Sequence, residues 1–167
     1  MANDALVRAR ALLNDITPLS FDCGRFCGAA CCAPDADGQG GVYLLPGEES
    51  LLGGCPWGHV EQTELAPMLV CEKPCDRDAR PFLCRIFPLT PWRRKDGTLS
   101  IRVDARAQSV CPLSRGGLQA LRSTFVRNAE EACALLLEEE ETGAFMEEWM
   151  REERAFRKEL KRLQALF

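Results

Sequence analysis

Hydrophobic residues recur at helical spacing near the start of the chain. The apolar positions between 4 and 15 fall on or near one face, which predicts an amphipathic helix. Asn3 stands where a helix N-cap is expected, and Pro18 would end the helix. The helix is short and carries charges throughout.

The same spacing returns from Leu118 to the end of the chain and predicts two longer helices. The acidic run 138–141 would end the first of them, which is electrostatically unfavourable at a helix C-terminus. Gly143 would separate the two. Two helices joined by a short break form an αα-hairpin, which is available to pack on the rest of the chain or to form a dimer or partner surface.

A strict alternation of apolar and polar residues over 99–103 predicts a half-buried strand. Asp96-Gly97 is a strong tight-turn signal before it, so a partner strand is expected over about 85–92. Pro88 and Pro91 place that partner at an edge or make it irregular. Together these segments predict a β-hairpin.

The middle of the chain predicts only short elements. Strands are expected over 42–45 and 68–71, and a short helix over 46–52, after a turn-rich surface loop over 35–41. The stretch 55–67 has no clear pattern. The expected class is therefore α+β: a small cysteine-rich region over 1–115 with short strands and a hairpin, and a C-terminal helical hairpin over 116–167, both within one structural unit.

Ten cysteines in 167 residues is a high count. Four of them lie in FDCGRFCGAACC at positions 21–32, among glycines and alanines. A straight helix would place Cys23 and Cys31 about 12 Å apart, too far for one ion whose thiolate ligands lie about 4 Å from each other. Gly24 and Gly28 favour a winding loop instead. Thiolates bind zinc, copper(I) and iron–sulfur clusters.

Cysteine-rich chains are either disulfide frameworks or metal-binding proteins. The first 16 residues have no apolar core typical of a signal peptide, and no run approaches the length of a transmembrane helix. We therefore expect a cytoplasmic protein with reduced thiols and no membrane partner. The net charge of −4 with no basic stripe argues against nucleic acid.

Eight of the ten cysteines are candidate metal ligands, enough for two four-coordinate sites. They are Cys23, Cys27, Cys31, Cys32, Cys71, Cys75, Cys84 and Cys111. Cys133 lies on the apolar side of a predicted helix and is interpreted as a core residue. Cys55 is interpreted as structural, and whether Cys55 or His59 binds metal is left open.

The chain resembles the YkgJ-type family, described as a zinc- or iron-chelating domain with a CxxCxxCC signature. The matching pieces are the cysteine run 23–32, the strand 42–45 followed by Glu49, the pair Cys71 and Cys75, the RPxxCRxFP element over 80–88, and Cys111. The first run reads C-x3-C-x3-CC here, so the resemblance assigns Cys23 and Cys27 less directly. A similar cysteine pattern occurs in flagellin lysine N-methylases. The resemblance covers about residues 20–113 and implies metal chelation.

Three charged residues are candidates for a supporting role around the ligands. Arg80 and Arg85 flank Cys84, and a guanidinium there would offset the negative charge of a thiolate site. Of the two we favour Arg85, because it adjoins Cys84. Glu49, with Glu48 beside it as the alternative, begins a short helix, where a carboxylate would cap the helix or bind a hard metal such as iron.

The sequence thus predicts a protein that binds zinc or iron through cysteine thiolates. Two alternatives stay open: an iron–sulfur protein, for instance with a [4Fe-4S] cluster, that is redox-active or catalytic, and a module in which metal holds the fold while the C-terminal helices bind a partner. No nucleotide loop or nucleophile elbow is present, so the sequence assigns no enzymatic activity.

Overall fold

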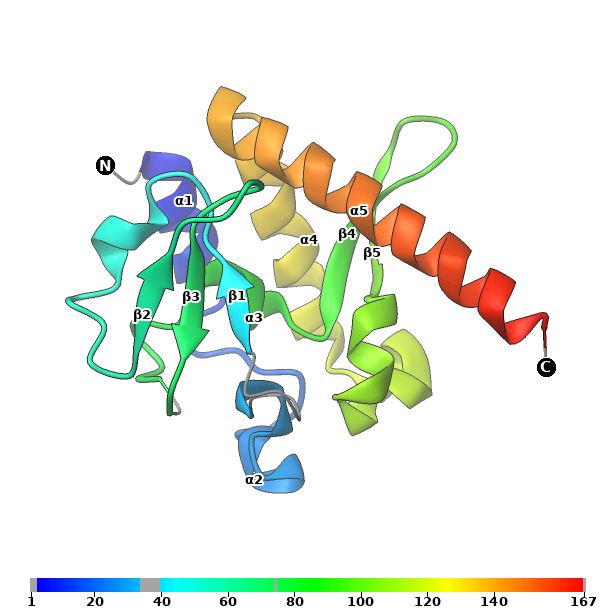
Figure 1. Ribbon diagram of the computed structural model, residues 1–167, viewed down its shortest axis with the longest axis horizontal. Coiled ribbons are helices and arrows are strands. Elements are labelled where there is room, and N and C mark those ends of the chain that lie inside the picture. Colours follow the sequence, from blue (N-terminus) through cyan, green and yellow to red (C-terminus); the bar gives the residue numbers. More distant parts are fainter. Residues whose placement is uncertain (1–2, 34–39, 74, 167) are drawn as a thin grey trace.

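Two small antiparallel sheets hold the strands, as the computed structural model shows (Figure 1). In the first sheet the order is β1–β3–β2, with β1 at Gly41–Tyr43, β2 at Gly58–Glu61 and β3 at Met68–Cys71. The second is a hairpin of β4 (Leu89–Arg93) and β5 (Leu99–Val103). Both sheets are short: the hairpin packs on the helices, and the first sheet also has a small apolar cluster of Leu44, Leu52 and Leu69.

The structure describes residues 3–33, 40–73 and 75–166. Most of the turn-rich loop predicted over 35–41 lies outside these ranges. Helices and strands are both present, which confirms the α+β class.

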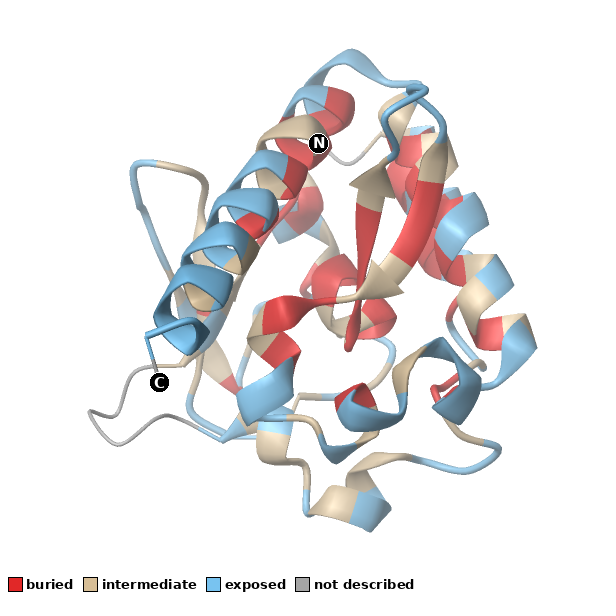
Figure 2. Cartoon of the chain, turned by 90° about the vertical axis from the view of Figure 1, so that its right-hand side faces the viewer, coloured by how far each residue is buried: buried red, intermediate tan, exposed pale blue. Residues whose placement is uncertain are grey.

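Four helices pack around one main core. They are α1 (Asp4–Ala11), α3 (Phe82–Ile86), α4 (Ser123–Leu137) and α5 (Glu140–Gln164). Helix α4 is central: α1 and α5 pack on it, and it also contacts β4 and β5 (Figures 1 and 2). Both halves of the chain contribute fully buried side chains to this core, among them Leu6, Phe82, Ile86, Phe125, Leu136 and Met146.

The first helix is shorter than predicted, but its cap is confirmed. The side-chain oxygen of Asn3 accepts a hydrogen bond from the Leu6 backbone N–H at 2.8 Å. Helix α1 ends at Ala11 and turns over the next residues, before Pro18.

The C-terminal helices divide at a different point from the one predicted. The break lies at Glu138 and Glu139, and Gly143 is buried inside α5. Glu140 and Glu141 therefore form the first turn of α5, where negative charge is stabilised by the helix dipole. Leu118 lies before α4, within the 3₁₀ turns of Pro112–Ala120.

The strand predictions were partly right. The turn at Asp96-Gly97 and the strand over 99–103 are confirmed, but residues 85–86 belong to α3 and the partner strand begins at Leu89. The first strand lies at 41–43 rather than 42–45. Strand β2 lies inside the stretch 55–67, which the sequence pattern left unassigned.

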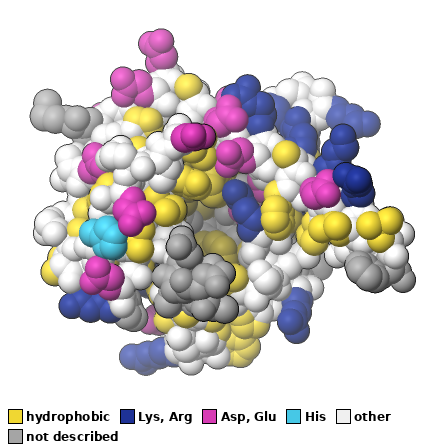
Figure 3. Space-filling model, viewed as in Figure 1, with side chains coloured by type: hydrophobic (Ala, Val, Ile, Leu, Met, Phe, Trp, Pro, Cys, Tyr) yellow, Lys and Arg dark blue, Asp and Glu magenta, His cyan; other side chains and the backbone are white. Residues whose placement is uncertain are grey.

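The last turns of α5 extend past the body of the molecule (Figure 1). Their side chains are mostly exposed, as the pale-blue turns near the C-terminus in Figure 2 show. Phe156, Leu163 and Leu166 are exposed there, and Figure 3 shows hydrophobic and charged side chains side by side at this end of the molecule.

Candidate metal centre

The cysteine run 23–32 is wound rather than straight, as its glycines predicted. One helical turn, α2 (Gly24–Cys27), ends at Gly28, whose φ of 65° is left-handed. Ala29 is also left-handed, and a 3₁₀ turn follows at Ala30–Cys32. Two consecutive left-handed residues reverse the chain, so this short segment turns its thiols toward the rest of the molecule.

Three further segments present cysteines to the same side of the molecule. Cys84 projects from α3, which is held in place because its neighbours Phe82 and Leu83 are buried in the main core. Cys71 ends β3 and Cys75 follows it, while Cys111 lies between the 3₁₀ turns Ala105–Ser109 and Pro112–Ala120. The fold thus gathers four segments that are far apart in sequence.

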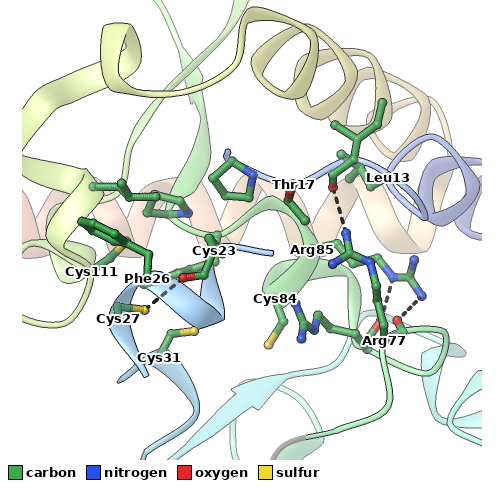
Figure 4. Close-up of a pocket in the computed structure, with 16 residues that line it drawn as sticks. Leu13, Thr17, Cys23, Phe26, Cys27, Cys31, Arg77, Cys84, Arg85 and Cys111 are labelled. Carbon is green, nitrogen blue, oxygen red and sulfur yellow. Dashed lines mark hydrogen bonds between the residues drawn. The ribbon is translucent and has the colours of Figure 1, made fainter. Parts of the chain in front are cut away.

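Five of these thiols line one small cavity of about 50 Å³: Cys23, Cys27, Cys31, Cys84 and Cys111. Cys31 and Cys84 direct their sulfur atoms toward one another across it (Figure 4). Arg77, Arg80 and Arg85 line the same cavity. Sulfur and guanidinium groups therefore share one partly enclosed space.

Electrostatic effects between the thiols reveal two neighbourhoods. In one, Cys75, Cys71 and Cys32 all raise the pKa of Cys84. In the other, Cys27 and Cys111 raise the pKa of Cys23, although burial and Asp22 raise it more. Cys31 lies between them, since Cys32, Cys84 and Cys23 all act on it. The structure brings all eight predicted ligands close together.

The thiols raise one another's pKa values. Burial raises the pKa of Cys84, and Cys75 and Cys71 raise it further. For the same reasons the pKa of Cys71 is raised to about 11. Cys32 is the exception: a hydrogen bond from the Cys31 thiol lowers its pKa to about 6, and Arg80 acts in the same direction. The neighbourhood resists accumulating negative charge unless a cation is near.

Arg80, rather than Arg85, is the guanidinium among the thiols. Burial lowers the pKa of Arg80, but a hydrogen bond with Cys75 and the nearby Cys84 and Cys32 raise it overall. Arg80 is therefore placed to compensate thiolate charge.

Arg85 has a different task from the one predicted. Its guanidinium donates to the backbone carbonyls of Arg80 at 2.8 Å and Asp78 at 2.7 Å, and to the side-chain oxygen of Asn14 at 2.5 Å. Burial lowers the pKa of Arg85 to about 10. It therefore fixes the 77–80 turn against the segment after α1, and in Figure 4 it points away from Cys84.

Glu49 is exposed, and its neighbour Glu48 is the buried carboxylate. Arg10 donates to Glu48 at 2.7 Å, and the backbone N–H groups of Phe82 and Leu45 donate at 2.6 and 3.1 Å. Glu48 thus joins α1, the first sheet and the start of α3. It supports the helix that carries Cys84 without approaching the thiols through these contacts.

The remaining candidates divide clearly. Cys133 is fully buried in the main core, as predicted. His59 is exposed on β2, with its ring nitrogens 3.1 Å from Glu61 and Glu72, and hydrogen bonds to these two residues raise its pKa. Cys55 lies near Cys71 and Cys75. Cys55 lies just before β2, a strand that the sequence pattern did not recognise, and the pattern therefore left its role open.

The thiols are close, but they are not arranged around a common point. Within residues 3–33, 40–73 and 75–166, no group of three or more His, Cys, Asp or Glu side chains has the geometry to hold a metal ion. The chemistry of the donors fits a soft metal, whereas their positions would have to close further around one.

We found no match to this chain among protein-family models, curated proteins or solved structures. In the part of the chain that the structure describes, every helix is too short or too polar to cross a membrane.

Proposed function

We propose that this chain binds zinc or iron through its clustered cysteine thiolates, as its resemblance to the YkgJ-type family implies. The observation that carries the proposal is the convergence of eight cysteines from four separate segments on one side of the fold. A core made only for stability does not need so many half-exposed thiols.

The charge balance of the cluster supports a cation as its ligand. Neighbouring thiols disfavour each other's ionised form, and Arg80 offsets only part of that effect. A divalent ion would bind several thiolates and release their protons. Because ligand loops commonly close around metal as it binds, the wider spacing of the thiols is compatible with uptake coupled to ordering.

Two chemical outcomes fall within this proposal. Closed four-thiolate zinc sites are usually structural, whereas iron bound with sulfide would favour a redox or catalytic role. Either site needs reduced cysteines, so we propose a cytoplasmic location. The cysteines are free in the structure, which supports this view.

The test is an anaerobic purification followed by metal analysis and an absorption spectrum of the same sample. We expect zinc or iron at one or two equivalents per chain. Brown colour with iron and acid-labile sulfide would select the iron–sulfur form, and a colourless zinc protein the structural form. Protein that stays free of both metals after reconstitution would overturn the proposal.

A matched pair of variants makes the test specific. Cys84→Ser removes the thiol that neighbours Cys75, Cys71 and Cys32, and we expect it to lose bound metal while α4 and α5 keep their helical signal. Cys133→Ser changes a cysteine buried in the main core and should leave metal content unchanged in protein that folds. Unchanged metal content in Cys84→Ser would reject the proposed set of ligands.

A further inference from the structure

Cys55 occupies a backbone conformation that a cysteine adopts only at a cost. Its φ is 48°, in the left-handed region, directly after Gly53 and Gly54. A residue with a side chain is disfavoured there, because its Cβ approaches the backbone, whereas glycine is not. A third glycine would therefore fit this backbone conformation better than a cysteine. The presence of cysteine here points to a role for its thiol.

In the fold, Cys55 lies at the end of β3, next to Cys71. Gly58 pairs with Cys71 in the β2–β3 ladder, and a side chain at position 58 would meet the Val70 carbonyl oxygen at 2.1 Å. Glycine thus allows the turn before β2 to lie tightly against β3. Cys55 and Cys71 pack against the same small cluster of Leu44, Leu52 and Leu69.

The turn at Cys55 shares two features with the turn at Cys111, a predicted ligand, although the backbone of Cys111 itself is extended. Each cysteine is followed by proline, and its carbonyl accepts from the backbone N–H three residues later, at 3.3 Å for Gly58 and 3.1 Å for Ser114. In each turn the amide two residues after the cysteine also donates to the sulfur, from Trp57 and from Leu113. Burial raises the pKa of both thiols, and these amide donors act against that effect.

We propose that Cys55 is a ninth metal-binding thiol, and that it forms with Cys71 and Cys75 one corner of the cluster for a soft divalent ion. This proposal rests on the proposed function and adds a ligand outside the eight that the sequence pattern predicts. It also divides the cluster: the corner where β2 begins and β3 ends is separate from the thiols around Cys23, Cys27 and Cys111.

The test compares Cys55→Gly and Cys55→Ser with Cys133→Ser in the full chain under anaerobic, reducing conditions. Zinc affinity is measured by competition with a chromophoric chelator. Cobalt(II) is the second probe, because its sulfur-to-metal charge-transfer band grows with the number of bound thiolates. We expect both Cys55 variants to lose zinc affinity by about tenfold or more and to weaken the cobalt band.

Cys55→Gly separates ligation from folding. Glycine relieves the left-handed φ, so the metal-free variant should melt at the same temperature as the wild type or higher. Weakened zinc binding in such a protein would support a ligand role. Zinc and cobalt binding equal to wild type in Cys55→Gly, with binding lost in Cys71→Ser, would overturn this inference alone. Wild-type protein that binds neither of these ions, and takes up no iron on reconstitution, would overturn it together with the proposed function.

Discussion

Glu48 connects the cysteine-bearing turns to the helical core at the scale of a single residue. Its carboxylate is fully buried, and it accepts hydrogen bonds from the Arg10 guanidinium and from the Phe82 backbone N–H at the start of α3. Burial raises the pKa of Glu48, whereas Arg10 and the amides act against that effect. The ion pair therefore matters less for its own energy than for the charge that would be stranded if one partner were removed.

We expect Glu48→Ala to lower the free energy of unfolding by about 3–5 kcal/mol, because Arg10 would remain buried without its carboxylate. Urea denaturation of the metal-free protein measures this change. Glu49→Ala is the matched control, since Glu49 is exposed beside it, and its effect should stay within about 0.5 kcal/mol. Similar losses of unfolding free energy in both variants would show that the buried contacts of Glu48 do not connect α1 to α3 as described.

Neighbours in sequence are poor guides to neighbours in space inside a helix. Cys84 and Arg85 are adjacent on α3, but successive helical residues point about 100° apart, so one faces the thiols and the other the 77–80 turn. The same reasoning separates Glu48 from Glu49. The sequence pattern could predict which residue types form the site. Only the packing of α3 and of the 3₁₀ turn decides which of two neighbouring residues faces the thiols or the core.

At the scale of elements, Gly143 has a packing role. A Cβ at this position would lie 3.0 Å from the Leu137 carbonyl oxygen at the end of α4. The absence of a side chain lets α5 begin immediately after α4. The sequence pattern took this glycine for a break because glycine is a poor helix former in isolation, and the tight connection that requires it is a tertiary feature.

Gly143→Ala should therefore fail to give the gain of about 1 kcal/mol that alanine brings to an ordinary helix position. We expect a loss of about 1 kcal/mol instead, as α4 and α5 are pushed apart. Thermal unfolding followed by circular dichroism measures it. Glu152→Gly, at an exposed position of the same helix, gives the ordinary cost of glycine in α5. A stabilised Gly143→Ala protein would contradict the packing role.

Element boundaries followed the sequence pattern wherever local chemistry sets them. The Asn3 cap, the Asp96-Gly97 turn and the alternation over 99–103 are local, and all were predicted correctly. Strand β2 was missed because its four residues gain their pairing only from β3. Most of α4 and the first half of α5 are occupied by the core, so the exposed end of α5 is the part left for the partner surface that we predicted.

At the scale of the whole molecule, the helical core and the thiols lie in different places. The main core joins α1, α3, α4, α5 and the β4–β5 hairpin, and it includes residues from both sides of position 115. The thiols lie on the turns around it, with Cys84 on α3 as the link. Helix α1 and the β4–β5 hairpin contribute buried apolar side chains to the main core, so their packing does not depend on the thiols.

Metal removal should thus loosen the cysteine-bearing turns and leave the core folded. Hydrogen exchange followed by mass spectrometry, on zinc-loaded protein and on protein stripped with a chelator, measures this segment by segment. We expect faster exchange without metal in 21–33, 53–58 and 71–80, and unchanged protection in α4 and the first half of α5, because those amides are held by buried apolar packing. Faster exchange throughout α4 and α5 would mean instead that metal and core fold as one cooperative unit, whereas identical exchange in the turns would show that they do not close around the ion.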